Sequence, residues 1–134
     1  VNAGSGVNVS GATQIAYCFH SVESYSKVGS YVGNGNANGP MVNCGFFPNF
    51  VMIKRTDSGS HWEIHDIARE PNNVKTKLLN ADQSNAEDNN ANSSVDFISN
   101  GFKLRTSHAE RNASGGTYIY AAFAESPFKN SNAR

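Results

Sequence analysis

Three side chains with metal-binding chemistry alternate along one short segment, namely His61, Glu63 and His65. Alternate residues of a β-strand point to the same face, and two imidazoles with one carboxylate form a known ligand set. The spacing differs from that of the helical His-Glu-x-x-His zinc site, and we find no partner for acid or base catalysis. We therefore favour a solvated polar face, with Trp62 and Ile64 pointing into the core, and keep the three as weak metal candidates.

A second group of residues has the chemistry of a saccharide site. Tyrosine rings stack on the apolar faces of sugars, and amide groups bond to sugar hydroxyls. Tyr25 and Tyr31 lie in one predicted strand, and Asn34, Asn36 and Asn38 lie in the loop that follows it. The competing interpretation is that the two rings are simply packed against the core. The group remains a candidate ligand-binding site.

Two further sets of reactive residues match no known motif. Asp82, Glu87 and Asp88 could supply oxygen ligands to a hard cation such as Ca²⁺, but they lack the ordered spacing and central glycine of a calcium loop, which favours a solvated loop. Cys18 and Cys44 each lie in an apolar run, where buried free thiols are the favoured interpretation and a disulfide the alternative. We predict no catalytic residue and no cofactor.

The composition excludes several classes of function. Lys and Arg number 11, as do Asp and Glu, so the chain has no net charge with which to attract nucleic acid or an anionic membrane. Only 16% of the residues are charged, whereas about one in seven is Asn, which stabilises turns and does not favour helices. No run of about 18 apolar residues is present, so we expect no membrane insertion. The composition predicts a turn-rich, all-β chain.

Alternation of apolar and polar residues predicts strands along most of the chain. The clearest local signal is the Asn-Gly turn within 99–101, which lies between alternating runs and predicts a hairpin of 95–98 with 102–105. Residues 117–125 are almost continuously apolar, which is typical of a central strand covered on both faces. The other predicted strands are residues 15–20, 25–32, 41–46, 50–55 and 61–67, with one more short strand in the polar excursion 70–94, where Val74, Leu78 and Leu79 are expected to be buried.

About eight short strands predict an antiparallel two-sheet β-sandwich of the jelly-roll or lectin kind, with a small barrel as the alternative. A chain of 134 residues can hold one core without a metal or disulfides, and we place that domain at residues 14–128. Residues 1–13 are expected to be a linker or the end of a preceding repeat, and residues 129–134 a C-terminal tail. Residues 1–6 lack the features of a signal peptide and read like linker, so we expect more sequence upstream.

A similarity between two segments of the sequence is relevant to this domain organisation. Residues 10–19 share Ser-Gly, Thr, Ile and Phe at identical spacing with residues 114–123. The match could be chance in a biased composition, or residues 10–19 could close a preceding repeat in a tandem array. Alternatively, the two segments could be symmetry mates within one sandwich, in which case removal of the first would unfold the domain.

Several stretches of the sequence resemble a known family. They are residues 15–23 with 25–31, 45–48 with 50–56, 96–105, and 117–125, so the resemblance covers the chain from about Ala12 onward. The family is a domain of unknown function common in large structural proteins of marine and freshwater tailed bacteriophages, often downstream of a concanavalin-like lectin domain. The resemblance implies a virion component such as a tail fibre or capsid-surface appendage, and it offers no catalytic motif to transfer.

We therefore expect a non-enzymatic structural module located on the virion, with a carbohydrate-binding module of an adhesin or depolymerase as the alternative. The expected partners are other virion proteins or further copies of this chain, with host surface glycans as an additional candidate ligand. Few charges mean little repulsion between copies, so we expect a homo-oligomer.

Overall fold

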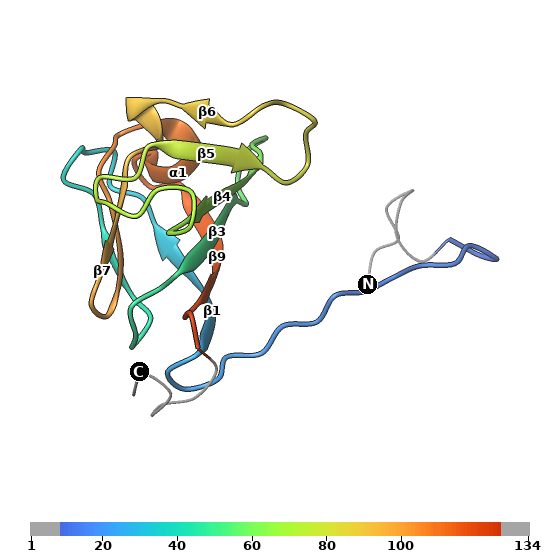
Figure 1. Cartoon of the computed structure of the whole chain (residues 1–134). Coiled ribbons are helices and arrows are strands. Elements are labelled where there is room, and N and C mark those ends of the chain that lie inside the picture. Colours follow the sequence, from blue (N-terminus) through green and yellow to red (C-terminus); the bar gives the residue numbers. More distant parts are fainter. Residues whose placement is uncertain (1–8, 127–134) are drawn as a thin grey trace.

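The computed structural model describes residues 9–126, which form two antiparallel sheets with little helix (Figure 1). The larger sheet has six strands in the order β1-β9-β3-β4-β5-β6, and the smaller has three in the order β2-β8-β7. The predicted two-sheet sandwich is confirmed, with nine strands where about eight were expected. The strands are β1 (Ser26–Val32), β2 (Met41–Asn43), β3 (Phe50–Arg55), β4 (Trp62–Asp66), β5 (Lys77–Asn80), β6 (Asp88–Asn89), β7 (Val95–Ile98), β8 (Gly101–Leu104) and β9 (Thr117–Phe123).

The core lies between the two sheets and is built largely from aromatic side chains. The Phe102 ring on β8 packs edge-on against Tyr120 on β9, with 5.3 Å between the ring centres. Tyr31 on β1 stacks on Tyr118 at 4.9 Å. Val51 and Ile53 point into the same core from β3 and are almost completely buried. Alternate residues of β1, β3 and β9 thus form the inner face of the larger sheet.

The predicted hairpin at residues 95–105 is confirmed as β7 and β8. Ile98 pairs with Gly101, so Ser99 and Asn100 form the two-residue turn and Gly101 already belongs to the strand. A Cβ atom at Gly101 would lie 1.9 Å from the carbonyl oxygen of Val42. Glycine is therefore required here because β2 approaches β8 too closely for any side chain.

β9 is the central strand that its sequence predicts. It pairs with β1 on one side, where Lys27 lies opposite Ala122, and with β3 on the other, where Val51 also lies opposite Ala122. Its inner residues are buried against the smaller sheet. β9 is therefore paired along both edges and lies second from one side of the six-stranded sheet, with its inner face covered by the smaller sheet.

The predicted first strand, residues 15–20, is not formed. Residues 12–20, here called the arm, belong to no strand and are exposed along their length. Figure 1 shows the arm leaving the sandwich near the start of β1 and running away from it. The alternating pattern predicts a strand, but a strand also needs a neighbouring strand to bond with, and residues 9–126 offer none there. The interpretation of residues 10–19 and 114–123 as symmetry mates within one sandwich is therefore wrong.

The polar excursion between β4 and β7 is more ordered than expected. It contributes β5, the two-residue β6 and a 3-10 turn (Ala91–Ser93). Leu78 is buried as predicted, but Val74 is exposed and Leu79 only partly buried. The aliphatic stem of Lys75 is buried instead, because its ammonium group lies 4.9 Å over the Phe97 ring and donates to the carbonyl of Glu70.

Helix is limited to short segments. Among residues 9–126 a single α-helical turn, α1 (Ala109–Asn112), precedes β9 and brings the buried residues Arg111 and Asn112 to the end of the sandwich. Among residues 9–126, no helix is long and apolar enough to cross a membrane. The predicted C-terminal tail, residues 129–134, and most of the predicted linker, residues 1–8, lie outside the described residues.

Candidate functional site

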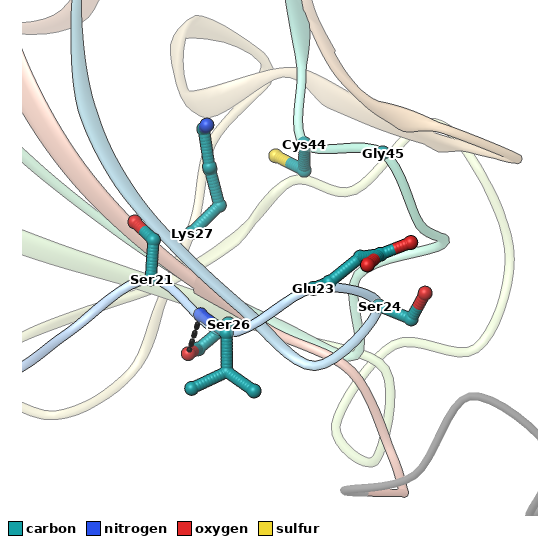
Figure 2. A pocket seen from close by; sticks show the side chains of 8 residues that line it. Ser21, Glu23, Ser24, Ser26, Lys27, Cys44 and Gly45 are labelled. Atoms are coloured by element: carbon teal, nitrogen blue, oxygen red, sulfur yellow. Dashed lines mark hydrogen bonds between the residues drawn. The ribbon is translucent and has the colours of Figure 1, made fainter.

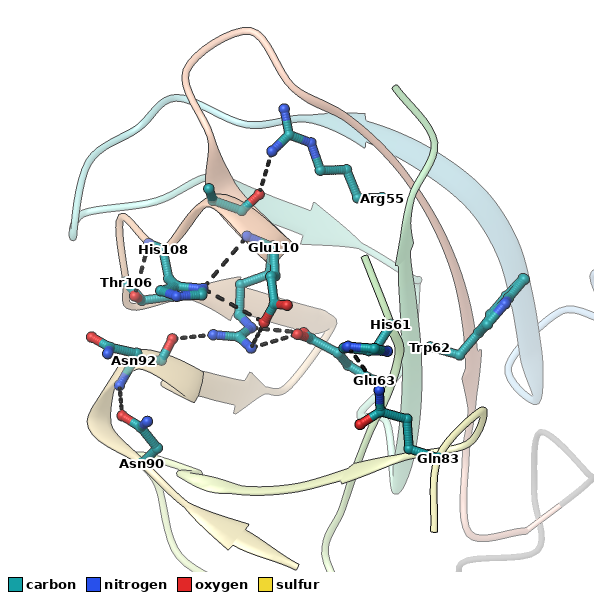
Figure 3. Close-up of polar contacts among 12 residues, drawn as sticks. Arg55, His61, Trp62, Glu63, Gln83, Asn90, Asn92, Thr106, His108 and Glu110 are labelled. Carbon is teal, nitrogen blue, oxygen red and sulfur yellow. Dashed lines mark hydrogen bonds and ion pairs between the residues drawn. The ribbon is translucent and has the colours of Figure 1, made fainter. Parts of the chain in front are cut away.

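The orientation predicted for β4 is wrong. Glu63 and His65 point into the core and are 1% and 0% exposed, whereas Trp62 is 36% exposed. Figure 3 shows Glu63 and Trp62 on opposite sides of the strand. The register with β3 explains this result, since Glu63 lies opposite the core residue Ile53. Alternation identified the two sets of side chains correctly but did not reveal which set is inside.

A buried ion pair makes the inward orientation of Glu63 possible. The Nε of Arg111, from α1, donates to Oε2 of Glu63 at 2.7 Å, and Nη2 donates to Oε1. Nη1 of Arg111 donates to the carbonyl of Asn92. Burial raises the pKa of the Glu63 carboxyl, and the two bonds from Arg111 oppose that rise. This bidentate arrangement satisfies both charges inside the sandwich, so its role is structural.

His65 is buried on the same inner face of β4 as Glu63, but within residues 9–126 it has no charged partner like Arg111. Neither ring nitrogen has a hydrogen-bond partner of normal geometry among the described residues. Burial lowers the pKa of His65 to about 3, and the nearby charges of Arg111 and Arg69 act in the same direction, while a backbone contact with Lys77 opposes them. The ring is therefore neutral at physiological pH.

The three metal candidates are not brought together. His61 precedes β4, is partly exposed, and contacts Asp82 at 3.1 Å and Gln83 at 3.0 Å. Within residues 9–126, no group of three His, Cys, Asp or Glu is placed to hold a metal ion. Of the acidic residues considered for Ca²⁺, Asp82 also accepts from the Trp62 amide, and Glu87 pairs with Arg69 at 2.9 Å. These contacts give both carboxylates structural partners.

The saccharide candidates divide between the two ends of β1. Tyr25 and Tyr31 are six residues apart along a strand, which corresponds to roughly 20 Å. Tyr25 contacts Phe123, with 6.1 Å between ring centres. The Tyr31 hydroxyl donates to the carbonyl of Arg111 at 2.8 Å, so its ring and hydroxyl both serve the core. Only Tyr31 lies near the predicted asparagine loop.

That loop, residues 33–39, is held in place by Asn112, which the sequence did not indicate. Oδ1 of Asn112 accepts from the Asn34 amide at 2.8 Å, and Nδ2 donates to the carbonyl of Asn36 at 2.8 Å. Asn34 and Asn36 also bond to loop amides two residues on, at 3.0 and 2.8 Å. These asparagines fix the backbone of the loop, and their side chains remain at the surface.

A pocket of about 400 Å³ lies between the start of β1, with the turn that precedes it, and the residues that follow β2 (Figure 2). The Cys44 thiol lines it, and burial raises the pKa of this thiol to about 11, so it is protonated and a poor nucleophile. Cys18 is exposed on the arm, so the expectation of two buried thiols holds for Cys44 alone; both cysteines are free. The other lining residues are Ser21, Val22, Glu23, Ser24, Ser26, Lys27 and Gly45.

The feature that stands out is the second face of the larger sheet. The strand registers place Val28, Ala121, Met52, Ile64 and Leu79 in one row across β1, β9, β3, β4 and β5, on the side away from the core. Within the described residues the smaller sheet covers only the opposite side; in the row itself Val28 is exposed, Met52, Ile64 and Leu79 are half-buried, and Ala121 is buried between its neighbours. Single antiparallel sheets usually present polar residues to water, so an apolar row across five strands is unusual.

Larger apolar side chains extend this row. Ile119 and Trp62 flank it on either side of Lys54, and they are 39% and 36% exposed. At one end of β9, the ring centres of Phe123 and Phe50 are 6.0 Å apart. We call this surface the outer apolar face; it consists of Val28, Phe50, Met52, Trp62, Ile64, Leu79, Ile119, Ala121 and Phe123. The signal for it in the sequence was the near-continuous apolar character of residues 117–125.

Comparison with known proteins identifies a family and no closer relative. The model of a family described as a domain of unknown function (DUF7483) matches residues 1–127. The chain belongs to this DUF7483 family. No curated protein and no solved structure matches it. The match includes both the arm and the sandwich.

Proposed function

We propose that this DUF7483 domain is a non-enzymatic structural module that assembles through its outer apolar face. The single observation behind the proposal is the mismatch at β9. Its sequence is largely apolar on both faces, as in strands buried on both sides, yet on the outer side the described chain leaves Ile119 39% exposed and packs aromatic rings only on Phe123. Burial of apolar surface is the main favourable term in protein association. A partner that covers Met52, Trp62 and Ile119 would remove this mismatch.

We propose a virion as the setting, in a tail fibre or a capsid-surface appendage. The support is the resemblance of residues 15–31, 45–56, 96–105 and 117–125 to domains of phage structural proteins. The low charge content, 16% of residues, fits close packing of many copies because like-charge repulsion is small. The proposed partners are other copies of the chain or neighbouring virion proteins.

Sedimentation equilibrium of the full chain tests the assembly proposal. Met52 lies at the centre of the outer apolar face, between Ala121 and Ile64, so Met52→Lys would place a charge within the interface. We expect the wild type to associate and Met52→Lys to be monomeric. Ser99→Lys is the matched control, because Ser99 is exposed in the β7–β8 turn on the smaller sheet, and it should associate like the wild type. Equal association of all three proteins would contradict the proposal.

The ordered loop 33–39 favours a second function, contact with host surface glycans. Asn112 fixes the loop backbone from inside, and a preorganised loop loses less entropy on binding. Asn36 and Asn38 are exposed there. A glycan array probed with the full chain tests this, with Asn38→Ala expected to weaken binding. Absence of binding to any glycan would leave assembly as the function.

A further inference from the structure

We propose that the arm of one copy lies across the outer apolar face of a second copy. This inference rests on the proposed function, because it names the partner that covers the face. It also gives a role to the apolar side chains of Ile15 and Tyr17, which are almost fully exposed on the arm. The partner is a second copy of this chain, and the contact is an exchange of arms.

The arm has the side chains of a strand that is buried on one side. Ile15 and Tyr17 are 80% and 82% exposed, and Phe19 is also exposed. These residues alternate along the chain, so in an extended arm they share one side. The other side carries Ala16 and Cys18, which are smaller. An isolated exposed apolar residue needs no explanation, but three in phase along an extended segment form a surface suited to a partner.

The arm begins at the border of the outer apolar face. The Phe19 ring packs edge-on against Phe123 with 5.8 Å between centres, and Phe123 lies at the end of β9 on that face. From there the arm runs away from its own sandwich (Figure 1). An arm that starts beside its own face and points outward is well placed to meet the same border of a second copy.

The dimensions and areas also fit. Nine extended residues span about 30 Å, whereas five strands span roughly 20 Å between the outermost axes, so one arm can cross the whole apolar row. From the spacing of strands and of same-face residues, the nine residues of the outer apolar face cover roughly 300 Å², below the roughly 800 Å² per partner found in a standard stable interface. In a reciprocal exchange each copy contributes its arm as well as its face, and Ile15, Tyr17 and Phe19 raise the area per copy to roughly 700 Å², which is within the range of such interfaces.

The arm brings no permanent charge to this contact, and the Lys54 ammonium group, which lies between Ile119 and Trp62 on the face, donates to the carbonyl of Arg55. Residues 12–20 contain no Asp, Glu, Lys or Arg, so burial of the arm desolvates no permanent charge. Each copy has one arm and one outer apolar face. Reciprocal exchange therefore closes a dimer, and sequential exchange builds a linear or cyclic array, with every face covered in a closed assembly.

Mixed disulfide cross-linking of full-length chains tests the arrangement. In a Cys18→Ser background, one protein carries Tyr17→Cys and a second, isotopically labelled, carries Met52→Cys. The matched control replaces Tyr17→Cys with Ala16→Cys, one residue away on the opposite side of the arm. Cys44 remains in all of them because it is buried. After mild oxidation, mass spectrometry identifies which pairs are linked and between which chains.

We expect the link between positions 17 and 52 of different chains to predominate several-fold over the link between positions 16 and 52. Links between two copies of position 52 without a 17–52 link would show that the faces pack directly, which overturns the arm exchange but leaves assembly through the face intact. An efficient 17–52 link inside one monomeric chain carrying both changes would also overturn it. Monomers with no intermolecular link would overturn both proposals.

Discussion

The two faces of the six-stranded sheet reverse the usual placement of side chains at β4. The inner face carries Glu63 and His65, which are fully buried, and the outer face carries Trp62 and Ile64. The inner face tolerates a charge because Arg111 reaches it from α1 with two hydrogen bonds. The outer face is apolar although aromatic rings of the described chain cover it only at Phe123, where Phe19 and Tyr25 pack. Partners, and not polarity alone, determine which side chains are buried.

The two faces differ in whether the side chains that cover them belong to the same chain. The inner face has its partners within the chain, since Arg111, the smaller sheet and the aromatic core all belong to it. Apart from the contacts of Phe19 and Tyr25 with Phe123, the outer face and the arm both present exposed apolar side chains, among them Ile119 and Tyr17. A substitution on the inner face should therefore change the stability of the monomer, whereas one on the outer face should change association.

The largest effect is expected from removal of the partner of Glu63. Arg111→Met leaves a buried carboxylate without its counter-charge, which should lower the free energy of unfolding by about 3–5 kcal/mol. Urea unfolding of the monomer measures the loss. The double variant Glu63→Met with Arg111→Met should recover most of it, because two apolar side chains can replace a buried ion pair. A loss below about 1 kcal/mol in the single variant would show that the pair does not support the inner face.

Two adjacent residues of β3 give the next test. Ile53 points inward and is 1% exposed, and Met52 points outward. Ile53→Ala should lower the free energy of unfolding by about 2–5 kcal/mol through the cavity it creates. Met52→Ala should cost less than about 1 kcal/mol when measured at concentrations where the chain is monomeric. Equal losses at both positions would mean that the outer face is as well packed as the core.

The smallest expected effect concerns His65. Its pKa is about 3 in the folded state and 6.5 when unperturbed, so the unfolded chain takes up a proton below pH 6.5 and the folded chain does not. Stability is thus present above pH 6.5 and is lost as the pH falls, by about 2 kcal/mol between pH 7 and pH 5. Urea unfolding of the wild type and His65→Leu at both pH values measures this, and between pH 7 and pH 5 the wild type should lose about 2 kcal/mol more than His65→Leu. A pH-independent difference would contradict the burial of a neutral imidazole.

The sequence predicted most of the fold because its local signals were strong. The segment 50–55 and the hairpin around Asn100 were assigned as the structure has them, since alternation and the Asn-Gly turn depend only on neighbouring residues. The central place of β9 also followed from its apolar run. The arm was predicted as a strand for the same local reason, but pairing depends on distant partners that alternation does not reveal.

The candidate sites were harder to predict for the same reason. The orientation of β4 depends on Arg111, which is 48 residues away from Glu63 in the chain. The conformation of the asparagine loop depends on Asn112, which is 78 residues from Asn34. Neither pairing has a signal in a single sequence. The outer apolar face did leave one, because residues 117–125 are apolar on both sides.

The central claim is that a partner covers the outer apolar face, and Trp62 reports on it directly. Trp62 is the only tryptophan in the chain, and it lies on that face. The measurement is acrylamide quenching of its fluorescence in the full wild-type chain over a dilution series, with Met52→Lys as the reference monomer. We predict that quenching is weak at high concentration and rises on dilution to the level of Met52→Lys. Quenching that equals that of Met52→Lys at every concentration would contradict the claim.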